Sequence, residues 1–137
     1  MPLGYLTRRA TFCASHRLHI SSKSESENKA LFGKCNHPHG HGHNYVLEVT
    51  VRSEIDPNSG MIMNLKDLKH IIDELILSDV DHKHLNLDVP EFKDKNPTAE
   101  MIALVFWKRL EKNLPERFLF EVKIHETENN VAFYRGE

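Results

Sequence analysis

The chain has 137 residues, of which 39% are hydrophobic and 28% charged, and its formal net charge is −2. These values predict one soluble domain over residues 1–137 with a buried core, and they indicate neither a nucleic acid nor an anionic membrane as partner. No apolar run approaches the length of a membrane span, and the first residues lack the apolar segment of a secretion signal. We therefore expect a cytoplasmic protein whose two cysteines, Cys13 and Cys35, are free thiols.

Residues 3–18 are predicted to form the first β-strand, because side chains of similar character alternate along them. From Phe12 onward, one face carries Phe12, Ala14 and His16, so a histidine lies on a mainly apolar face. Cys13 lies on the opposite, polar face, and we interpret it as a structural residue.

Residues 19–40 are predicted to form a long connection with a strongly polar first part. A connection of this length in a small domain is usually functional or disordered. Its last part, residues 30–35, is less polar, and we expect it to fold back over the site that follows.

A histidine-rich segment leads directly into the second predicted strand, which ends near residue 53. From Cys35 it reads C-N-H-P-H-G-H-G-H-N-Y-V-L-E-V-T-V. The period of a strand places His41 and His43 on the same face as the apolar residues that follow, where two imidazoles can chelate one metal ion. His39 and His41 form a competing pair with the same spacing. We prefer His41 and His43, because Pro38 interrupts strand pairing just before His39.

A third histidine, His16, lies on the apolar face of the neighbouring strand. Three protein ligands with an open fourth position are typical of catalytic rather than structural zinc. The sequence therefore predicts a metal site at His16, His41 and His43. Cys35 is either a fourth ligand that closes this site, a nucleophile or base whose pKa a neighbouring imidazole lowers, or an inert side chain.

The middle of the chain predicts a turn, a helix and a loop. Residues 56–60 (D-P-N-S-G) are a strong turn signal. A helix is predicted from its N-cap Asn64 to about Leu77, since apolar residues recur there every three or four positions. The loop that follows carries Asp81 and His82, and a carboxylate can orient and charge a neighbouring imidazole. Adjacent loop residues often point apart, so this pair alone is weak evidence of a relay.

A second helix is predicted between Asn96 and Pro115, with proline at an early helical position. Thr98 and Glu100 lie at its start, where such residues are common because they favour the helix terminus.

Residues 118–126 and 131–134 are predicted to form two strands joined by a hairpin turn. Glu126 ends a row of apolar residues on one face. It is either a wet residue at the strand end or a buried acceptor that takes two N–H donors of a ligand. The order ββααββ predicts an α+β fold in which two helices cover one face of an antiparallel sheet.

Six motifs recur in the order found in one enzyme family. They are F-x-A-S-H (12–16), F-G-K-C-N-x-P-x-G-H-G-H-N-Y (32–45), E-I-D-P-x-x-G-M (54–61), D-H-K (81–83), P-T-A-E (97–100) and H-E-T-x-N-N (125–130). Over nearly its whole length the chain resembles the 6-pyruvoyl-tetrahydropterin synthases. The resemblance also favours His41 and His43 over the competing pair.

The resemblance implies the tunnelling fold, a four-stranded antiparallel sheet with two helices on one face. Three subunits would close a barrel, and two trimers would form a homohexamer with sites between subunits. The substrate would be 7,8-dihydroneopterin triphosphate. The enzyme would be a carbon–oxygen lyase of tetrahydrobiopterin synthesis that eliminates triphosphate while the side chain undergoes internal redox, without an external redox cofactor.

The resemblance also implies the role of each site residue. One Zn²⁺ per subunit would act as a Lewis acid on the substrate hydroxyls, and its ligands would be His16, His41 and His43. The proton acceptor and donor with its relay would be Cys35, Asp81 and His82. The residues at the pterin would be the anchor Glu126 together with Thr98 and Glu100. The chain has extra histidines where asparagine is expected in the family, at His37, His39 and His84.

Related chemistry and other classes of function remain as alternatives. The 6-carboxy-tetrahydropterin synthases show C-x3-H-G-H, which Cys35 to His41 also spells, whereas the preferred ligand pair gives C-x5-H-G-H. A structural zinc protein and a pterin-binding protein without catalysis are the alternatives from other classes.

Overall fold

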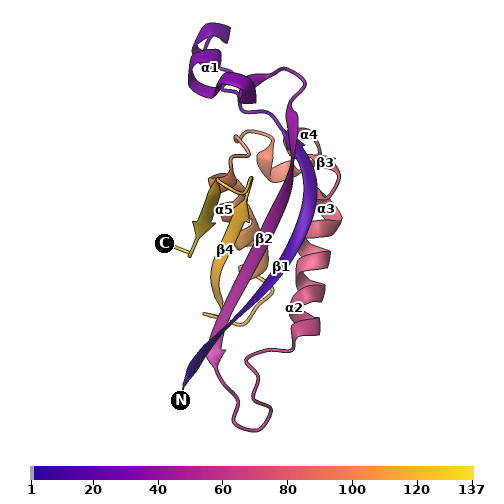
Figure 1. Ribbon diagram of the computed structural model, residues 1–137, viewed down its shortest axis with the longest axis vertical. Coiled ribbons are helices and arrows are strands. Elements are labelled where there is room, and N and C mark those ends of the chain that lie inside the picture. Colours follow the sequence, from indigo (N-terminus) through magenta and orange to yellow (C-terminus); the bar gives the residue numbers. More distant parts are fainter. Residues whose placement is uncertain (1) are drawn as a thin grey trace.

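The computed structural model describes residues 2–137. Its two longest strands, β1 (Leu3–His16) and β2 (His41–Glu54), pair antiparallel along their whole length. β4 (Leu119–His125) pairs antiparallel with β2, and β5 (Val131–Tyr134) pairs antiparallel with β4, as predicted for the second hairpin. Helices cover one face of this sheet (Figure 1). The α+β class is that expected, and the strands carry the candidate site at one end of the β1–β2 ladder.

The predicted four-stranded antiparallel sheet of order ββααββ is corrected in two respects. Within residues 2–137 the sheet has five strands, in the order β3-β1-β2-β4-β5, and the fifth is β3 (Lys83–His84). β3 pairs in parallel with Ala14 and Ser15 of β1, so the sheet is mixed. A strand of two residues has no measurable alternation, and the sequence pattern therefore gives no sign of it.

The connection between β1 and β2 contains helix α1 (Glu25–Phe32) and a 3-10 turn, η1 (Gly33–Asn36). A capping box begins α1: the Ser24 hydroxyl accepts the Glu27 N–H, and the Glu27 carboxylate accepts the Ser24 N–H. The helix projects beyond the end of the sheet (Figure 1). Its mostly exposed side chains lack an apolar stripe, which explains why the pattern predicts a loop there.

The helices on the covered face follow the turn after β2. α2 (Leu65–Ile72) begins at its predicted N-cap Asn64, whose side chain accepts the Lys66 N–H. It continues through a π-helical turn, η2 (Asp73–Leu77), into α3 (Ser78–Val80). The remaining helical elements of residues 2–137 are α4 (Leu85–Asp88), η3 (Pro90–Phe92) and α5 (Ala99–Glu111). Pro97 precedes the Thr98 N-cap of α5 and so lies outside the helix, not inside it as predicted.

The core lies between these helices and the apolar face of the sheet. The predicted alternation along β2 is confirmed, because Tyr45, Leu47, Val49 and Val51 are all buried. Phe12 of β1 stacks on Tyr45, with their ring centroids 4.9 Å apart. The helices contribute Leu68, Ile72, Ile76, Ile102 and Phe106. This packing fixes the strand face on which the candidate ligands lie.

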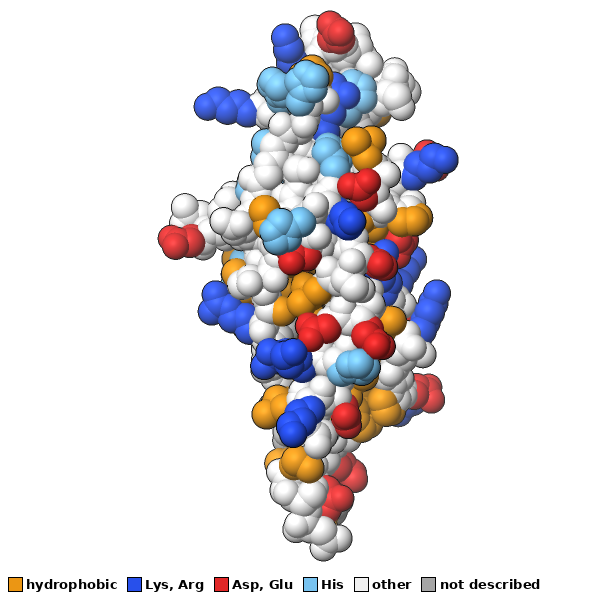
Figure 2. Space-filling model, turned by 90° about the vertical axis from the view of Figure 1, so that its right-hand side faces the viewer, with side chains coloured by type: hydrophobic (Ala, Val, Ile, Leu, Met, Phe, Trp, Pro, Cys, Tyr) orange, Lys and Arg blue, Asp and Glu red, His pale blue; other side chains and the backbone are white. Residues whose placement is uncertain are grey.

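Charges of both signs are mixed on the face of the molecule that carries α2 and α3 (Figure 2). Figure 2 shows the side where α2 and α3 border the edge of β1, with acidic and basic side chains interspersed and histidines toward the upper end. Within residues 2–137, no helix combines the length and the apolar character that a membrane crossing requires.

Candidate metal centre and active site

Three histidines from the paired ends of β1 and β2 meet in one small space. His16 lies directly opposite His41 in the ladder, and His43 lies opposite the residue two before His16. Their ligand nitrogen atoms all lie within 4.8 Å of one another, and the Nε2 atoms of His16 and His41 are 3.2 Å apart. Two nitrogen ligands of one tetrahedral Zn²⁺, each at about 2.0–2.1 Å from the ion, lie about 3.4 Å apart. The three side chains therefore fit a metal ion of this kind.

Hydrogen bonding and burial favour the orientation and the neutral protonation state in which these imidazoles can bind a metal. Nδ1 of His16 lies 2.7 Å from the carbonyl oxygen of Pro97, and a donated hydrogen bond there leaves the lone pair on Nε2 for a metal. Nε2 of His43 is buried without a hydrogen-bond partner among residues 2–137, and a metal would satisfy it. Burial lowers the pKa of His16 to about 4 against the opposing effect of the Pro97 hydrogen bond. Burial and the nearby His43 also lower the pKa of His41, so the neutral form that binds metals is favoured.

The positions of the side chains favour His43 over His39 as a candidate ligand. His39 is exposed and lies outside the set of three histidines that can hold a metal ion. Gly40 lies between His39 and His41 and lets the loop turn there, because its φ of +76° is favoured by glycine. A Cβ at this position would lie 2.8 Å from the backbone oxygen of His16, which is too close for any other residue. His37 also lies outside the set, and its ring centroid is 5.7 Å from that of His39.

Glu126 lies beside the three histidines, immediately after β4. Its carboxylate oxygens lie 4.0 Å from Nε2 of His16 and 4.0 Å from Nε2 of His43, and its side chain is 22% exposed. Thr98 and Glu100 line the same pocket as Glu126, so the structure brings the three predicted substrate residues together. Thr98 is also the N-cap of α5, because its hydroxyl accepts the Met101 N–H.

Cys35 lies in η1 and is half-buried. Its carbonyl oxygen accepts the N–H of Leu18, which ties the turn to the end of β1. Within residues 2–137 the set that can hold a metal consists of the three histidines and does not include Cys35. The expected fold-back of residues 30–35 is limited to the turn, since Leu31 is 58% exposed.

Asp81 and His82 point toward each other, but the structure does not place them against Cys35. Oδ1 of Asp81 lies 3.0 Å from Nδ1 of His82 and accepts the backbone N–H of Cys13 at 2.9 Å. The Cys13 N–H, and then the nearby His82, hold the pKa of Asp81 below its usual value. The His82 side chain is 80% exposed. Within residues 2–137 neither side chain forms a hydrogen bond or an ion pair with Cys35.

The role of Cys13 is the part of the site that sequence reasoning misses. Its backbone N–H binds Asp81, and its carbonyl oxygen accepts the N–H of His82 at 2.6 Å. Asp81 is 68 residues from Cys13 along the chain, and His82 follows Asp81 directly. On Cys13 both contacts use main-chain atoms, which carry no signal in the side-chain pattern. No side-chain pattern could have indicated it.

Comparisons with known proteins identify the family. The profile of 6-pyruvoyl tetrahydropterin synthase matches residues 5–137. The chain belongs to this family. The 6-pyruvoyl tetrahydrobiopterin synthases of Homo sapiens and Poecilia reticulata are each 52% identical to it. These alignments cover 96% of this chain and 91% of the human protein, and 98% of this chain and 92% of the fish protein.

A solved structure agrees with this assignment. The 6-pyruvoyl tetrahydropterin synthase of Caenorhabditis elegans superposes with a TM-score of 0.94 at 42% identity, over 100% of this chain and 98% of that chain. The fold is therefore that of the 6-pyruvoyl tetrahydropterin synthase family, and the synthase relatives indicate that the chain is an enzyme.

The metal set makes a direct prediction for single histidine variants. His43→Ala is expected to abolish stoichiometric metal binding, because it removes one of three converging nitrogen ligands. His39→Ala is the matched control and is expected to retain metal, since His39 is exposed outside the set. Metal content per chain after gel filtration, measured by mass spectrometry, checks both. Loss of metal in His39→Ala with retention in His43→Ala would contradict the assignment.

Proposed function

We propose that the chain is a zinc-dependent 6-pyruvoyl-tetrahydropterin synthase of tetrahydrobiopterin biosynthesis. It converts 7,8-dihydroneopterin triphosphate to 6-pyruvoyl-tetrahydropterin and triphosphate. The observation that carries the proposal is the convergence of three histidines beside the half-buried carboxylate of Glu126, which lines a pocket. The synthase names of relatives that are 52% identical support the same reaction.

The residues present fit a bound Zn²⁺ at the three histidines. The ion would be held by His16, His41 and His43, and when bound it supplies Lewis acidity toward the substrate hydroxyls. The chain's own contribution is geometric. The β1–β2 ladder sets the separation of the imidazoles, and the Pro97 carbonyl oxygen fixes the tautomer and orientation of His16.

Glu126 is proposed to anchor the pterin ring. A carboxylate accepts two adjacent N–H donors as a bidentate pair, which fixes both the position and the tilt of a planar heterocycle. Because its oxygen atoms lie 4.0 Å from two of the histidines, a ring held there places its side chain at the metal centre. Thr98 and Glu100 line the remainder of this pocket.

Cys35 is proposed as the proton acceptor and donor, with the relay residues Asp81 and His82 supplied by a neighbouring subunit. Two observations support an arrangement between subunits. His82 is 80% exposed while Asp81 holds it, so its imidazole is available to another chain. Among the described residues 2–137, β3 pairs with Ala14 and Ser15 alone of β1, so most of that edge offers main-chain groups to a second copy. A closed barrel of subunits, doubled into a homohexamer, removes such edges.

The Cys35 role predicts a separation between metal content and turnover. Cys35→Ala is expected to retain its metal and to lose about 10²-fold or more in kcat, because a general acid–base group contributes that much. Cys13→Ala is the matched thiol control and is expected to keep near-normal activity, since Cys13 holds Asp81 through its backbone. Metal analysis and steady-state kinetics on the same samples check this. Loss of metal in Cys35→Ala would instead identify Cys35 as a ligand.

The Glu126 role predicts weaker substrate binding. Glu126→Gln is expected to raise KM about tenfold, because the neutral amide replaces a charged acceptor with one acceptor and an opposed donor. Glu128→Gln, on the exposed turn two residues later, is the charge-matched control. Equal KM values for both variants would contradict the assignment.

The reaction itself is tested by incubating the purified, zinc-loaded protein with 7,8-dihydroneopterin triphosphate. Release of triphosphate together with 6-pyruvoyl-tetrahydropterin, identified by mass spectrometry, is the expected result. A 6-carboxy product would assign the chain to the related 6-carboxy-tetrahydropterin synthase activity. Binding of the substrate without release of triphosphate would leave a pterin-binding protein and overturn the enzyme proposal.

A further inference from the structure

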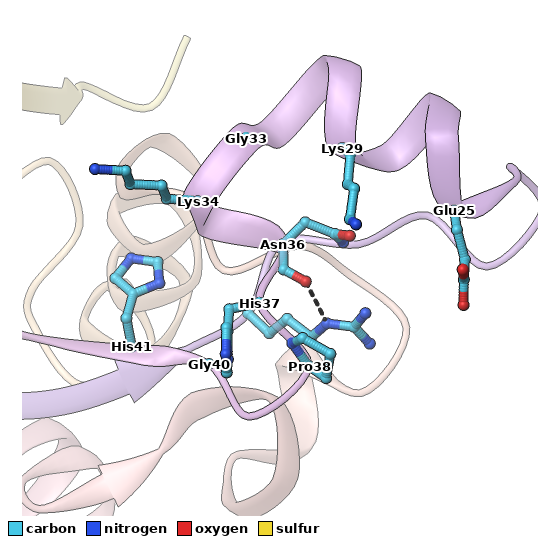
Figure 3. A pocket seen from close by; sticks show the side chains of 10 residues that line it. Glu25, Lys29, Gly33, Lys34, Asn36, His37, Pro38, Gly40 and His41 are labelled. Atoms are coloured by element: carbon cyan, nitrogen blue, oxygen red, sulfur yellow. Dashed lines mark hydrogen bonds between the residues drawn. The ribbon is translucent and has the colours of Figure 1, made fainter.

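A second pocket, of about 710 Å³, adjoins the metal centre on the side of α1. Its wall contains Arg17, which directly follows β1, Glu25 and Lys29 from α1, Lys34 from η1, and the candidate ligand His41. Figure 3 shows Lys34 on the same side of the loop as the His41 ring, with Lys29 and Glu25 along the helix above. The pocket therefore reaches one of the three metal ligands directly.

The basic residues of this pocket are not neutralised by neighbouring carboxylates. Within residues 2–137, no ion pair is formed by Arg17, Lys29 or Lys34. Cations elsewhere on the chain that do pair with carboxylates are Lys23, Lys69, Arg109, Lys123 and Arg135. Nε of Arg17 donates to the carbonyl oxygen of Asn36 at 3.1 Å, which positions its guanidinium group. Unpaired cations in a concave wall concentrate positive potential and favour an anion.

The pockets on the two sides of the histidines have opposite charge. The pocket lined by Glu126 is also lined by a second carboxylate, Glu100. The pocket beside α1 is lined by three cations, Arg17, Lys29 and Lys34, and by one carboxylate, Glu25. A molecule that spans the metal centre would therefore place hydrogen-bond donors at Glu126 and anionic groups at the lysines. A donor-rich heterocycle joined by a short carbon chain to an oligophosphate has this polarity.

We propose that this basic pocket, formed by Arg17, Lys29 and Lys34, binds the triphosphate group of the substrate, and that α1 is one wall of this subsite. The assignment rests on the proposed function, which supplies the triphosphate. In the elimination, the C–H electron pair of the carbon that loses its proton forms the new C=C bond. The electron pair of the broken C–O bond leaves with the triphosphate, and the cations stabilise that charge.

Inorganic triphosphate is the probe that tests the subsite without turnover. Calorimetric titration of the zinc-loaded protein is expected to show Kd values about tenfold higher in Lys34→Met and in Lys29→Met than in the unmodified chain, since each loses a charged contact. Lys108→Met, which removes an exposed lysine of α5, is the matched control and leaves Kd unchanged.

Glu25→Gln provides a test of opposite sign. Removal of the single carboxylate in the wall is expected to lower the Kd for triphosphate, an effect that a damaged fold cannot produce. Unchanged binding in all three pocket variants, or orthophosphate bound as tightly as triphosphate, would overturn the subsite.

Kinetic measurements distinguish failure of the proposed triphosphate subsite from failure of the proposed function on which it rests. Lys34→Met is expected to raise KM for dihydroneopterin triphosphate and to leave the binding of dihydroneopterin, which has no phosphate, unchanged. Turnover with normal KM in both lysine variants would overturn the subsite and leave the function standing. Absence of turnover in every protein, with lysine-dependent triphosphate binding, would overturn the function and with it the assignment to this substrate.

Discussion

The candidate metal centre depends on the full-length antiparallel pairing of β1 with β2. The ladder brings His16 opposite His41, and the period of two then places His43 on the same face. A slip of one residue in this register would turn both β2 histidines toward the other side of the sheet and expose the apolar row from Tyr45 to Val51. Core packing therefore holds the ligands in place, because the side chains that resist the slip are continuous with the site.

Several separate elements then complete the site around this rigid ladder. The residue before the N-cap of α5 contributes the Pro97 carbonyl oxygen that orients His16, and the end of β4 places Glu126 4.0 Å from two histidines. The connection from α1 through η1 supplies the basic wall on the other side. The chemical character of the candidate site therefore changes along its length. Within residues 2–137 it has carboxylates at one end, imidazoles in the middle and cations without ion pairs at the other. That order matches a substrate with a heterocycle at one end and a triphosphate at the other.

The sequence predicts the parts of this arrangement that depend on alternation. His16, His41 and the apolar row of β2 follow from a period of two, and the inward position of Glu126 follows from the same rule. Caps such as Asn64 follow from local hydrogen bonding. Other features carry no such signal. β3 is too short to have a period, and α1 has almost no buried face, so helical spacing of apolar residues does not indicate it. The position of Asp81 depends on a main-chain contact with Cys13 across 68 residues.

Anomalous X-ray diffraction at the zinc absorption edge tests most directly whether the three histidines hold a metal ion. Crystals of the zinc-loaded protein are predicted to show an anomalous peak about 2.0–2.1 Å from one nitrogen each of His16, His41 and His43, with no sulfur ligand. A peak bound instead by the sulfur of Cys35, or by His39 in place of His43, would contradict this assignment.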